Sequence, residues 1–140
     1  MLVSKSTVLN IALFEKLRII SIIIFYISQM NLKESIQRKL SEFLYLCKSH
    51  NVKTIYAFGS SVNNNFNDET SDFDLLIEIE NDDPIVRGEN LISIWDKFEE
   101  LFQRKVDLLT NSSIRNPILK RSIDSTKILI YDGKEQKVSF

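Results

Sequence analysis

The stretch of sequence that decides the fold is IYAFGSSVNNNFNDETSDFDLLIEIE, residues 55–80. It reads as an apolar strand that ends at Gly59-Ser60, a polar loop, and a second strand that carries Asp72 and Asp74. Side chains alternate between the two faces of a strand, so residues two apart point to the same face. The two carboxylates are therefore expected together on one face of the second strand.

A pair of carboxylates this close predicts a cation site. Two negative charges a few ångströms apart repel each other unless a cation lies between them. Ligation by oxygen alone suits Mg²⁺, with Mn²⁺ as the alternative. The Gly-Ser pair that ends the preceding strand allows backbone amides to approach a phosphate closely. The pattern thus predicts a metal site beside a phosphate cradle.

Composition narrows the class of protein. A chain of 140 residues, of which 44% are hydrophobic, is expected to form one domain with a real core. Its formal net charge of −1 creates no field that would attract nucleic acid, so no direct nucleic-acid binding is predicted. Cys47 is the only cysteine, which excludes an internal disulfide and a cysteine zinc cluster and fits a cytoplasmic location.

Residues 1–29 differ from the rest of the chain. Residues 19–27 form a strongly apolar run, but charged residues lie just before it. The run is also shorter than the roughly 18–20 residues that span a bilayer, so no stable membrane insertion is predicted. Asn31 and Glu34 have the spacing of a helix N-cap and its reciprocal partner. We interpret residues 1–29 as an N-terminal apolar extension and residues 30–140 as the functional domain.

Hydrophobic periodicity predicts alternating helices and strands in this domain. A helix is expected over residues 32–49, with Leu40 in its apolar stripe. A second helix follows the apolar set within residues 91–102, with Glu99 and Glu100 on its solvated face. Asn116 and Pro117 are typical of the start of a short helix. Strands are expected over residues 53–58, 72–80, 104–109 and 127–131, the last at an edge of the sheet and followed by a frayed polar tail.

A third acid, Asp107, lies on the third of these strands. Its neighbours Val106 and Leu108 favour burial, and an unpaired carboxylate among buried residues is costly. Asp107 is therefore expected to need a cation, a hydrogen-bond donor or a metal ion.

The order of these motifs resembles the minimal nucleotidyltransferases of the DNA polymerase β-like superfamily. The matching segments are FGSS (58–61), SDFDLLIE (71–78), KVDLLT (105–110), NPILKRSI (116–123) and KILIYD (127–132). The resemblance covers essentially the whole domain after the extension. It implies an α/β (α+β) nucleotidyltransferase fold, in which a mixed, mostly antiparallel sheet of about four strands is flanked by helices.

The resemblance also implies a reaction and its residues. Gly59 and Ser60 would hold the triphosphate of ATP. Asp72 and Asp74 would ligate two Mg²⁺ ions, and Asp107 would complete the site of the metal nearest the acceptor. Two metals about 3.5–4 Å apart activate an attacking oxygen and stabilise the leaving pyrophosphate, which agrees with this division of roles. Asp107 is also a candidate to accept the proton of the acceptor hydroxyl.

The chain departs from the family pattern in its loop. Family members often carry an arginine shortly after the Gly-Ser pair, whereas residues 61–71 contain no basic residue. Four basic residues elsewhere are candidates for phosphate or partner contacts, although surface solubility is the simpler role for each: Lys105, Arg115, Lys120 and Arg121.

Small stand-alone members of this family resemble antitoxins that pair with a HEPN-domain RNase toxin and transfer AMP onto one of its tyrosines. The leading hypothesis is therefore a Mg²⁺-dependent protein adenylyltransferase that acts as such an antitoxin. Two alternatives stay open. One is a nucleotidyltransferase for a small hydroxyl substrate, and the other is a non-catalytic module that neutralises its partner by binding.

Overall fold

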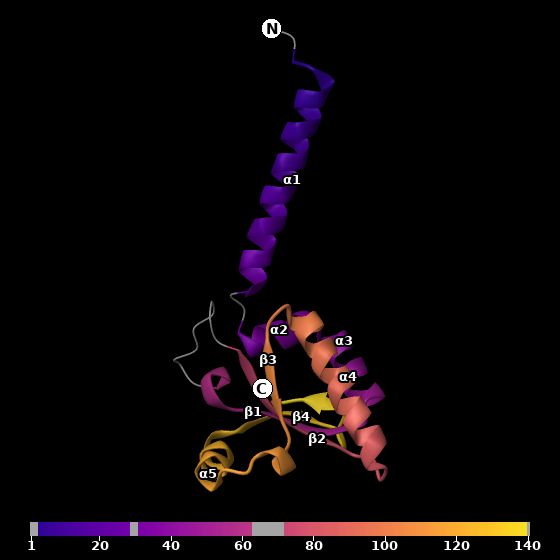
Figure 1. Ribbon diagram of the computed structural model, residues 1–140, viewed down its shortest axis with the longest axis vertical. Helices are drawn as coiled ribbons and strands as arrows, with labels where there is room; N and C mark the ends of the chain where they lie inside the picture. Colours follow the sequence, from indigo (N-terminus) through magenta and orange to yellow (C-terminus); the bar gives the residue numbers. More distant parts are fainter. Residues whose placement is uncertain (1–2, 29–30, 63–71, 140) are drawn as a thin grey trace.

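The computed structural model of the chain describes residues 3–28, 31–62 and 72–139, and within them a long helix extends away from a compact α/β body (Figure 1). The helices are α1 (Lys5–Ser28), α2 (Leu32–Arg38), α3 (Leu40–Ser49), α4 (Pro84–Phe102) and α5 (Pro117–Thr126), with two short 3-10 turns, η1 (Gly59–Ser61) and η2 (Asn111–Ser113). The strands are β1 (Val52–Ala57), β2 (Phe73–Ile79), β3 (Val106–Leu109), β4 (Ile128–Asp132) and β5 (Lys137–Val138).

The strands form one sheet in the order β3-β2-β1-β4-β5. β2 and β3 run parallel, whereas the pairs β1–β2, β1–β4 and β4–β5 are antiparallel. This mixed, mostly antiparallel sheet with flanking helices confirms the predicted fold class. The described residues contain five strands rather than about four, because the short strand β5 pairs with the end of β4.

The strand β5 also corrects the prediction of a frayed tail after an edge strand. The chain reverses at Gly133, whose N–H donates to the carbonyl oxygen of Lys53 at 2.8 Å. A Cβ at this position would lie 2.5 Å from the carbonyl oxygen of Val52, so only glycine allows so close a passage. The reversal places Val138 opposite Tyr131 and ties the tail to the sheet.

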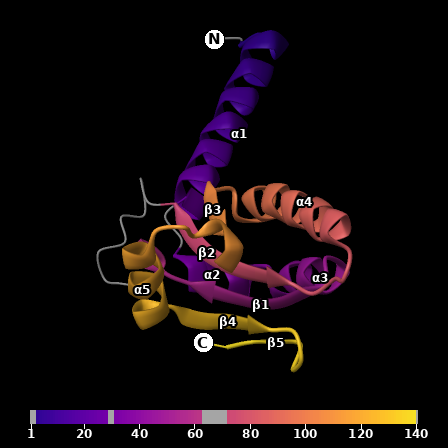
Figure 2. The ribbon, with the colours of Figure 1, turned by 60° about the horizontal axis from the view of Figure 1, so that its bottom comes forward.

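The side chains of β2 alternate between the two faces of the sheet and contribute to two separate hydrophobic clusters. Phe73, Leu75 and Ile77 are buried in the larger cluster, which α3 and α4 cover. Leu76 points the other way and packs in a smaller cluster with Ile123 of α5. The helices α3 and α4 lie side by side, and α5 lies apart from them (Figures 1 and 2). The odd- and even-numbered residues of β2 therefore face different helices, as the alternating pattern predicted.

The first predicted helix of the domain is broken at Lys39 into α2 and α3. Lys39 has φ −122° and ψ 36°, and its N–H donates to the carbonyl oxygen of Ile36, a tight closure that ends α2. After the break, Phe43 and Cys47 are buried in the core, whereas Leu40 is 40% exposed. The prediction that Leu40 belongs to the core stripe is therefore wrong, because the break takes it out of line with its neighbours.

Side-chain caps begin three helices at the residues where the sequence placed a polar group. Asn31, Asp83 and Asn116 each accept a hydrogen bond from a backbone N–H two or three residues further along the chain, at 3.0, 2.8 and 2.9 Å. Pro follows directly after the second and third of these caps, where its missing N–H costs nothing. The predicted helix starts at Asn31 and Asn116 are confirmed.

The helix α1 stands apart from the rest of the fold. Its described side chains, from Lys5 to Ile24, are exposed, including apolar ones such as Leu9 and Phe14. Every buried side chain in the described part of the chain lies between Leu32 and Tyr131. Within the described residues, no helix combines the length and the apolar character that crossing a membrane requires.

Candidate active site

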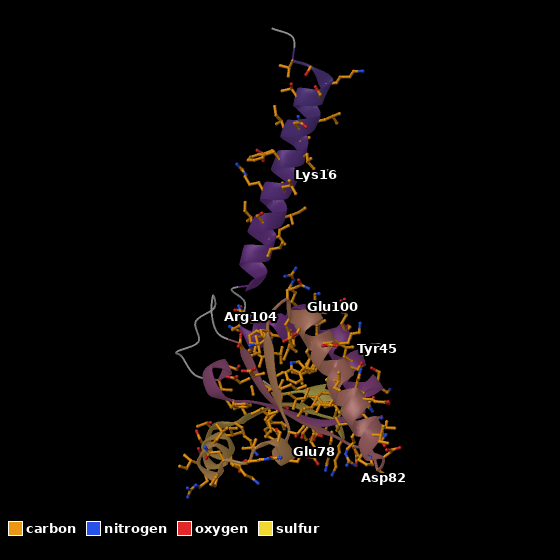
Figure 3. All side chains as sticks on the ribbon, in the orientation of Figure 1. Lys16, Tyr45, Glu78, Asp82, Glu100 and Arg104 are labelled. Atoms are coloured by element: carbon orange, nitrogen blue, oxygen red, sulfur yellow. The ribbon has the colours of Figure 1, made fainter. Side chains whose placement is uncertain are left out.

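One end of the sheet gathers the residues that the sequence singled out. β1 ends there and β2 begins there because these strands are antiparallel, and β3 begins there because it runs parallel to β2. Gly59 follows β1, Asp72 precedes β2, and Asp107 is the second residue of β3. Arg104, just before β3, marks this end in Figure 3, whereas Glu78, near the end of β2, lies at the opposite end.

Asp74 and Asp107 are directly opposite each other across the parallel pair β2–β3. Neighbouring strands lie about 4.8 Å apart and paired residues point to the same face, so the two carboxylates share one face of the sheet. Asp74 is half-buried and Asp107 is exposed. The prediction that Asp107 lies among residues that force it to find a partner is wrong. Val106 and Leu108 are buried, and the side chain between them turns to solvent.

Asp72 brings a third carboxylate to this end, and the ammonium group of Lys105 lies beside it. The Nζ atom of Lys105 lies 3.8 Å from Oδ2 of Asp72, and the two side chains are 69% and 35% exposed. An exposed pair of this kind contributes at most about 1 kcal/mol to stability. From the sequence, Lys105 was a candidate for phosphate or partner contacts, with surface solubility as the simpler role; in the structure its ammonium group lies beside Asp72. The sequence held a signal for this position. Lys105 lies two residues before Asp107, and in an extended chain residues two apart point to the same side.

Gly59 lies against the carboxylate of Asp74. Its φ of 60° is in the left-handed region, and a Cβ at this position would lie 2.6 Å from Oδ2 of Asp74. A larger residue would therefore suffer both backbone strain and a clash with the carboxylate. The sequence predicted that the backbone at Gly59 approaches a phosphate; in the structure the atom nearest to its missing Cβ is Oδ2 of Asp74, and the phosphate role of Gly59 stays a prediction.

Ser61 is a site residue that the sequence did not single out. Its Oγ atom accepts a hydrogen bond from the N–H of Asp74 at 2.8 Å. The carbonyl oxygen of Asp74 accepts another from the N–H of Phe58 at 3.1 Å. Both backbone groups of Asp74 are thus held by the FGSS segment, and the available signal was a serine placed just after a strand, where its hydroxyl favours backbone partners. The side chain of Ser60 and residues 63–71 lie outside the described residues, so the phosphate role of Ser60 stays a prediction.

The donor set at this end of the sheet fits a hard divalent cation. Carboxylate oxygens are the ligands that Mg²⁺ and Mn²⁺ prefer. In the described ranges, no three His, Cys, Asp or Glu side chains are drawn together tightly enough to hold a metal ion. Asp74 and Asp107 share one face of the sheet and Asp72 lies at the same end, but the three form no closed ligand cluster, and their metal-binding roles stay predictions.

The comparison with protein families agrees with this geometry. A family model described as a nucleotidyltransferase domain matches residues 30–130, a range that contains Gly59 and the three aspartates. This chain belongs to the nucleotidyltransferase domain family. The prediction of a nucleotidyltransferase is thereby confirmed.

Relatives and solved structures add further likenesses. A protein of Methanocaldococcus jannaschii named as a candidate protein adenylyltransferase is 35% identical over 99 residues, which cover 71% of this chain and 94% of that protein. A second protein of that organism with the same description is 36% identical over 85 residues, covering 61% and 83%. A solved complex of a tri-AMPylated HEPN toxin of Shewanella oneidensis with an MNT antitoxin aligns over 71% of this chain and 74% of the matched chain, at 19% identity and a TM-score of 0.44.

Proposed function

We propose that this nucleotidyltransferase transfers AMP from ATP to a hydroxyl group of a partner protein, with Mg²⁺ as the activating cation. The observation that carries the proposal is the register of β2 and β3, which places Asp74 opposite Asp107 while Gly59 lies against Asp74. Membership of the nucleotidyltransferase family supports the transfer of a nucleotidyl group. The names of the two relatives support AMP as that group and a protein as its acceptor.

The residues at the end of the sheet have distinct roles in this proposal. Asp72 and Asp74 would hold two Mg²⁺ ions, and Asp107 would complete the ligand set on the acceptor side. Ions held there would supply positive charge at the phosphates and would lower the cost of deprotonating the attacking hydroxyl. Gly59, which begins η1 and carries no side chain, would let its backbone approach the triphosphate closely. Lys105 brings a positive charge to a site whose loop contains none.

The transfer is a substitution at the α-phosphorus of ATP. A bond forms between the acceptor oxygen and the α-phosphorus, and the bond from that phosphorus to the bridging oxygen of the β-phosphate breaks, so that pyrophosphate leaves. The proton of the acceptor hydroxyl passes to the carboxylate of Asp107. Because this carboxylate is exposed on the edge strand β3, it is open to a large acceptor such as a protein.

The acceptor that we propose is a tyrosine of a HEPN-family RNase toxin, which this protein silences as its antitoxin. The basis is the resemblance of the FGSS, SDFDLLIE and KVDLLT segments to small stand-alone nucleotidyltransferases that act on such toxins. This part of the proposal rests on family analogy, whereas nucleotidyl transfer rests on the site itself.

The first prediction concerns the paired aspartates. When the protein is incubated with ATP, Mg²⁺ and a HEPN-family toxin as the acceptor, intact mass spectrometry should show AMP added to that toxin. Asp72→Asn and Asp74→Asn each keep the size of the side chain but remove its charge, so each should reduce the rate of transfer by about 100-fold or more. Asp82→Asn, an exposed acid in the turn before α4, is the matched control and should leave the rate unchanged.

Three outcomes would redirect the proposal. A double variant, with both Asp72 and Asp74 replaced by Asn, that still neutralises the toxin with no added mass would show a binding module rather than an enzyme. AMP that appears only on a small molecule would show that the acceptor is not a protein. Transfer that proceeds unchanged in the single variants would remove the paired aspartates from the site.

A further inference from the structure

The edge strand β3 is held at its first residue by two side chains of α4. Val106 is fully buried, and both of its backbone polar groups bind outside the sheet. The indole N–H of Trp95 donates to the carbonyl oxygen of Val106 at 2.7 Å. The N–H of Val106 donates to Oε1 of Glu99 at 3.1 Å. We call Trp95, Glu99 and the backbone of Val106 the β3 clamp.

The β3 clamp takes the place of a missing strand. An edge strand pairs with only one neighbour, so the backbone groups of every second residue have no strand opposite them. The carbonyl oxygen of Lys105 accepts a hydrogen bond from the N–H of Phe73 in β2 at 3.1 Å, so the groups of the next residue, Val106, point outward. Trp95 and Glu99 are four residues apart and therefore adjacent on α4, where one supplies a donor and the other an acceptor.

Neither side chain had this role in the sequence analysis. Trp95 belonged to the apolar set of α4, and Glu99 was assigned to its solvated face. In the structure Trp95 is 38% exposed and uses its N–H, and Glu99 is half-buried. Burying a backbone N–H or carbonyl without a hydrogen-bond partner is costly, so each of the two contacts satisfies a backbone group of Val106 that would otherwise be unpaired.

We infer that Trp95 and Glu99 are positioning residues that fix Asp107 for nucleotidyl transfer by clamping Val106. The inference rests on the proposed function. Asp107 follows Val106 directly, in a strand of only four residues that pairs with β2 on one side alone. A ligand or base must be held within about 0.5 Å of its working position to act efficiently. When the β3 clamp opens, the start of β3 frays and the carboxylate of Asp107 loses its place opposite Asp74.

Four variants of the full chain test this inference. Trp95→Phe keeps an aromatic ring but removes the N–H donor, and Glu99→Ala removes the acceptor. Glu99→Gln keeps an acceptor oxygen and should restore the behaviour of the natural protein. Glu100→Ala is the matched control, since Glu100 is the next residue of α4 and its carboxylate pairs with exposed Lys97.

The measurements separate positioning from general stability. Amide hydrogen exchange at Val106 and Asp107 should become about 3- to 10-fold faster in Glu99→Ala and Trp95→Phe, because each loses one hydrogen bond. Calorimetric titration should show Mg²⁺ binding weakened by about 10-fold or more in both variants, as for other partners that orient a ligand. In transfer assays the Mg²⁺ concentration for half-maximal rate should rise by a similar factor, with the KM for ATP unchanged. Glu99→Gln and Glu100→Ala should match the natural protein.

The outcomes distinguish this inference from the proposed function. Faster exchange at Val106 with unchanged Mg²⁺ affinity would mean that the β3 clamp is only structural, and the inference would be wrong. Unchanged exchange and unchanged affinity would also overturn it. If the natural protein binds Mg²⁺ but transfers no AMP, the proposed function fails. In that case weaker Mg²⁺ binding in Glu99→Ala still supports the positioning of Asp107, and unchanged binding contradicts it.

Discussion

Gly59 serves the backbone and the site at once. Its left-handed φ of 60° turns the chain out of β1 into η1, and its missing side chain leaves room for Oδ2 of Asp74. The same residue therefore determines where the strand ends and how closely the paired carboxylates approach the turn. A second glycine, Gly88 in α4, has open space around it and provides a natural comparison.

We expect Gly59→Ala and Gly88→Ala to have opposite effects on stability. Gly59→Ala should lower the free energy of unfolding by about 1–2 kcal/mol through backbone strain, and it should abolish AMP transfer because the new Cβ displaces the Asp74 carboxylate. Gly88→Ala should raise the free energy of unfolding by about 0.5–1 kcal/mol, since alanine restricts the unfolded chain and favours the helix. Urea denaturation and the transfer assay measure both effects. A Gly59→Ala variant with natural stability and activity would contradict the role given to this glycine.

At the scale of elements, α1 and α4 contrast in how they treat their apolar residues. α4 buries Ile94 and Phe98 in the core and adds the β3 clamp on its flank. α1 leaves its described apolar side chains exposed, although burial of such groups is the main driving force for folding. The described core begins at Leu32, so α1 contributes no side chain to it.

We propose that residues 30–140 fold without the extension of residues 1–29. A chain that starts at Met30 should keep the same midpoint of urea unfolding as the full chain, because no buried side chain of the described core is removed. It should also associate less in solution, since exposed apolar surface promotes aggregation. Circular dichroism and light scattering measure the two effects. A truncated chain that unfolds at a lower urea concentration would show that the extension belongs to the domain.

The whole molecule is organised around one aromatic core between the sheet and the helices α3 and α4. Phe43 stacks on Phe98 with ring centroids 5.5 Å apart, and Phe73 meets Phe102 edge-on at 5.4 Å. Cys47 is buried in this core, and burial raises the pKa of its thiol far above the ordinary range. The ionisation of this single cysteine therefore reports whether the core is folded.

We expect stability to fall in alkaline solution because of Cys47. The unfolded thiol loses its proton above about pH 8.5, whereas the folded thiol keeps it, so the folded state binds more protons there. The free energy of unfolding should therefore decrease above that pH, by up to about 1.4 kcal/mol per pH unit from this group alone. Urea denaturation between pH 7 and pH 9.5, as approximate limits of the window, tests the effect. Cys47→Ala should remove this part of the slope, and a slope that persists unchanged in that variant would assign it to other groups.

The sequence by itself determined the acids of the site and most of the strands and helices between Leu32 and Asp132. Periodicity of two identified β2 and placed Asp72 and Asp74 on one face, and polar residues before apolar stripes identified the starts of α2 and α5. These features depend on residues a few positions apart, so a linear pattern records them. The predicted strand boundaries differ from the observed ones by one or two residues, as at β1, and the break at Lys39 was missed because no glycine or proline marks it in the sequence.

The tertiary structure determined which groups lie around the three aspartates. Only the parallel register of β2 and β3 placed Asp74 opposite Asp107 and brought Lys105 to Asp72. The edge position of β3 exposed Asp107 and left Val106 to be held by α4. These arrangements join segments that are far apart in the chain, and their energy comes from hydrogen bonds and burial that exist only after folding. The sequence therefore named the carboxylates, and the packing of α4 and β3 on β2 determined how they are presented.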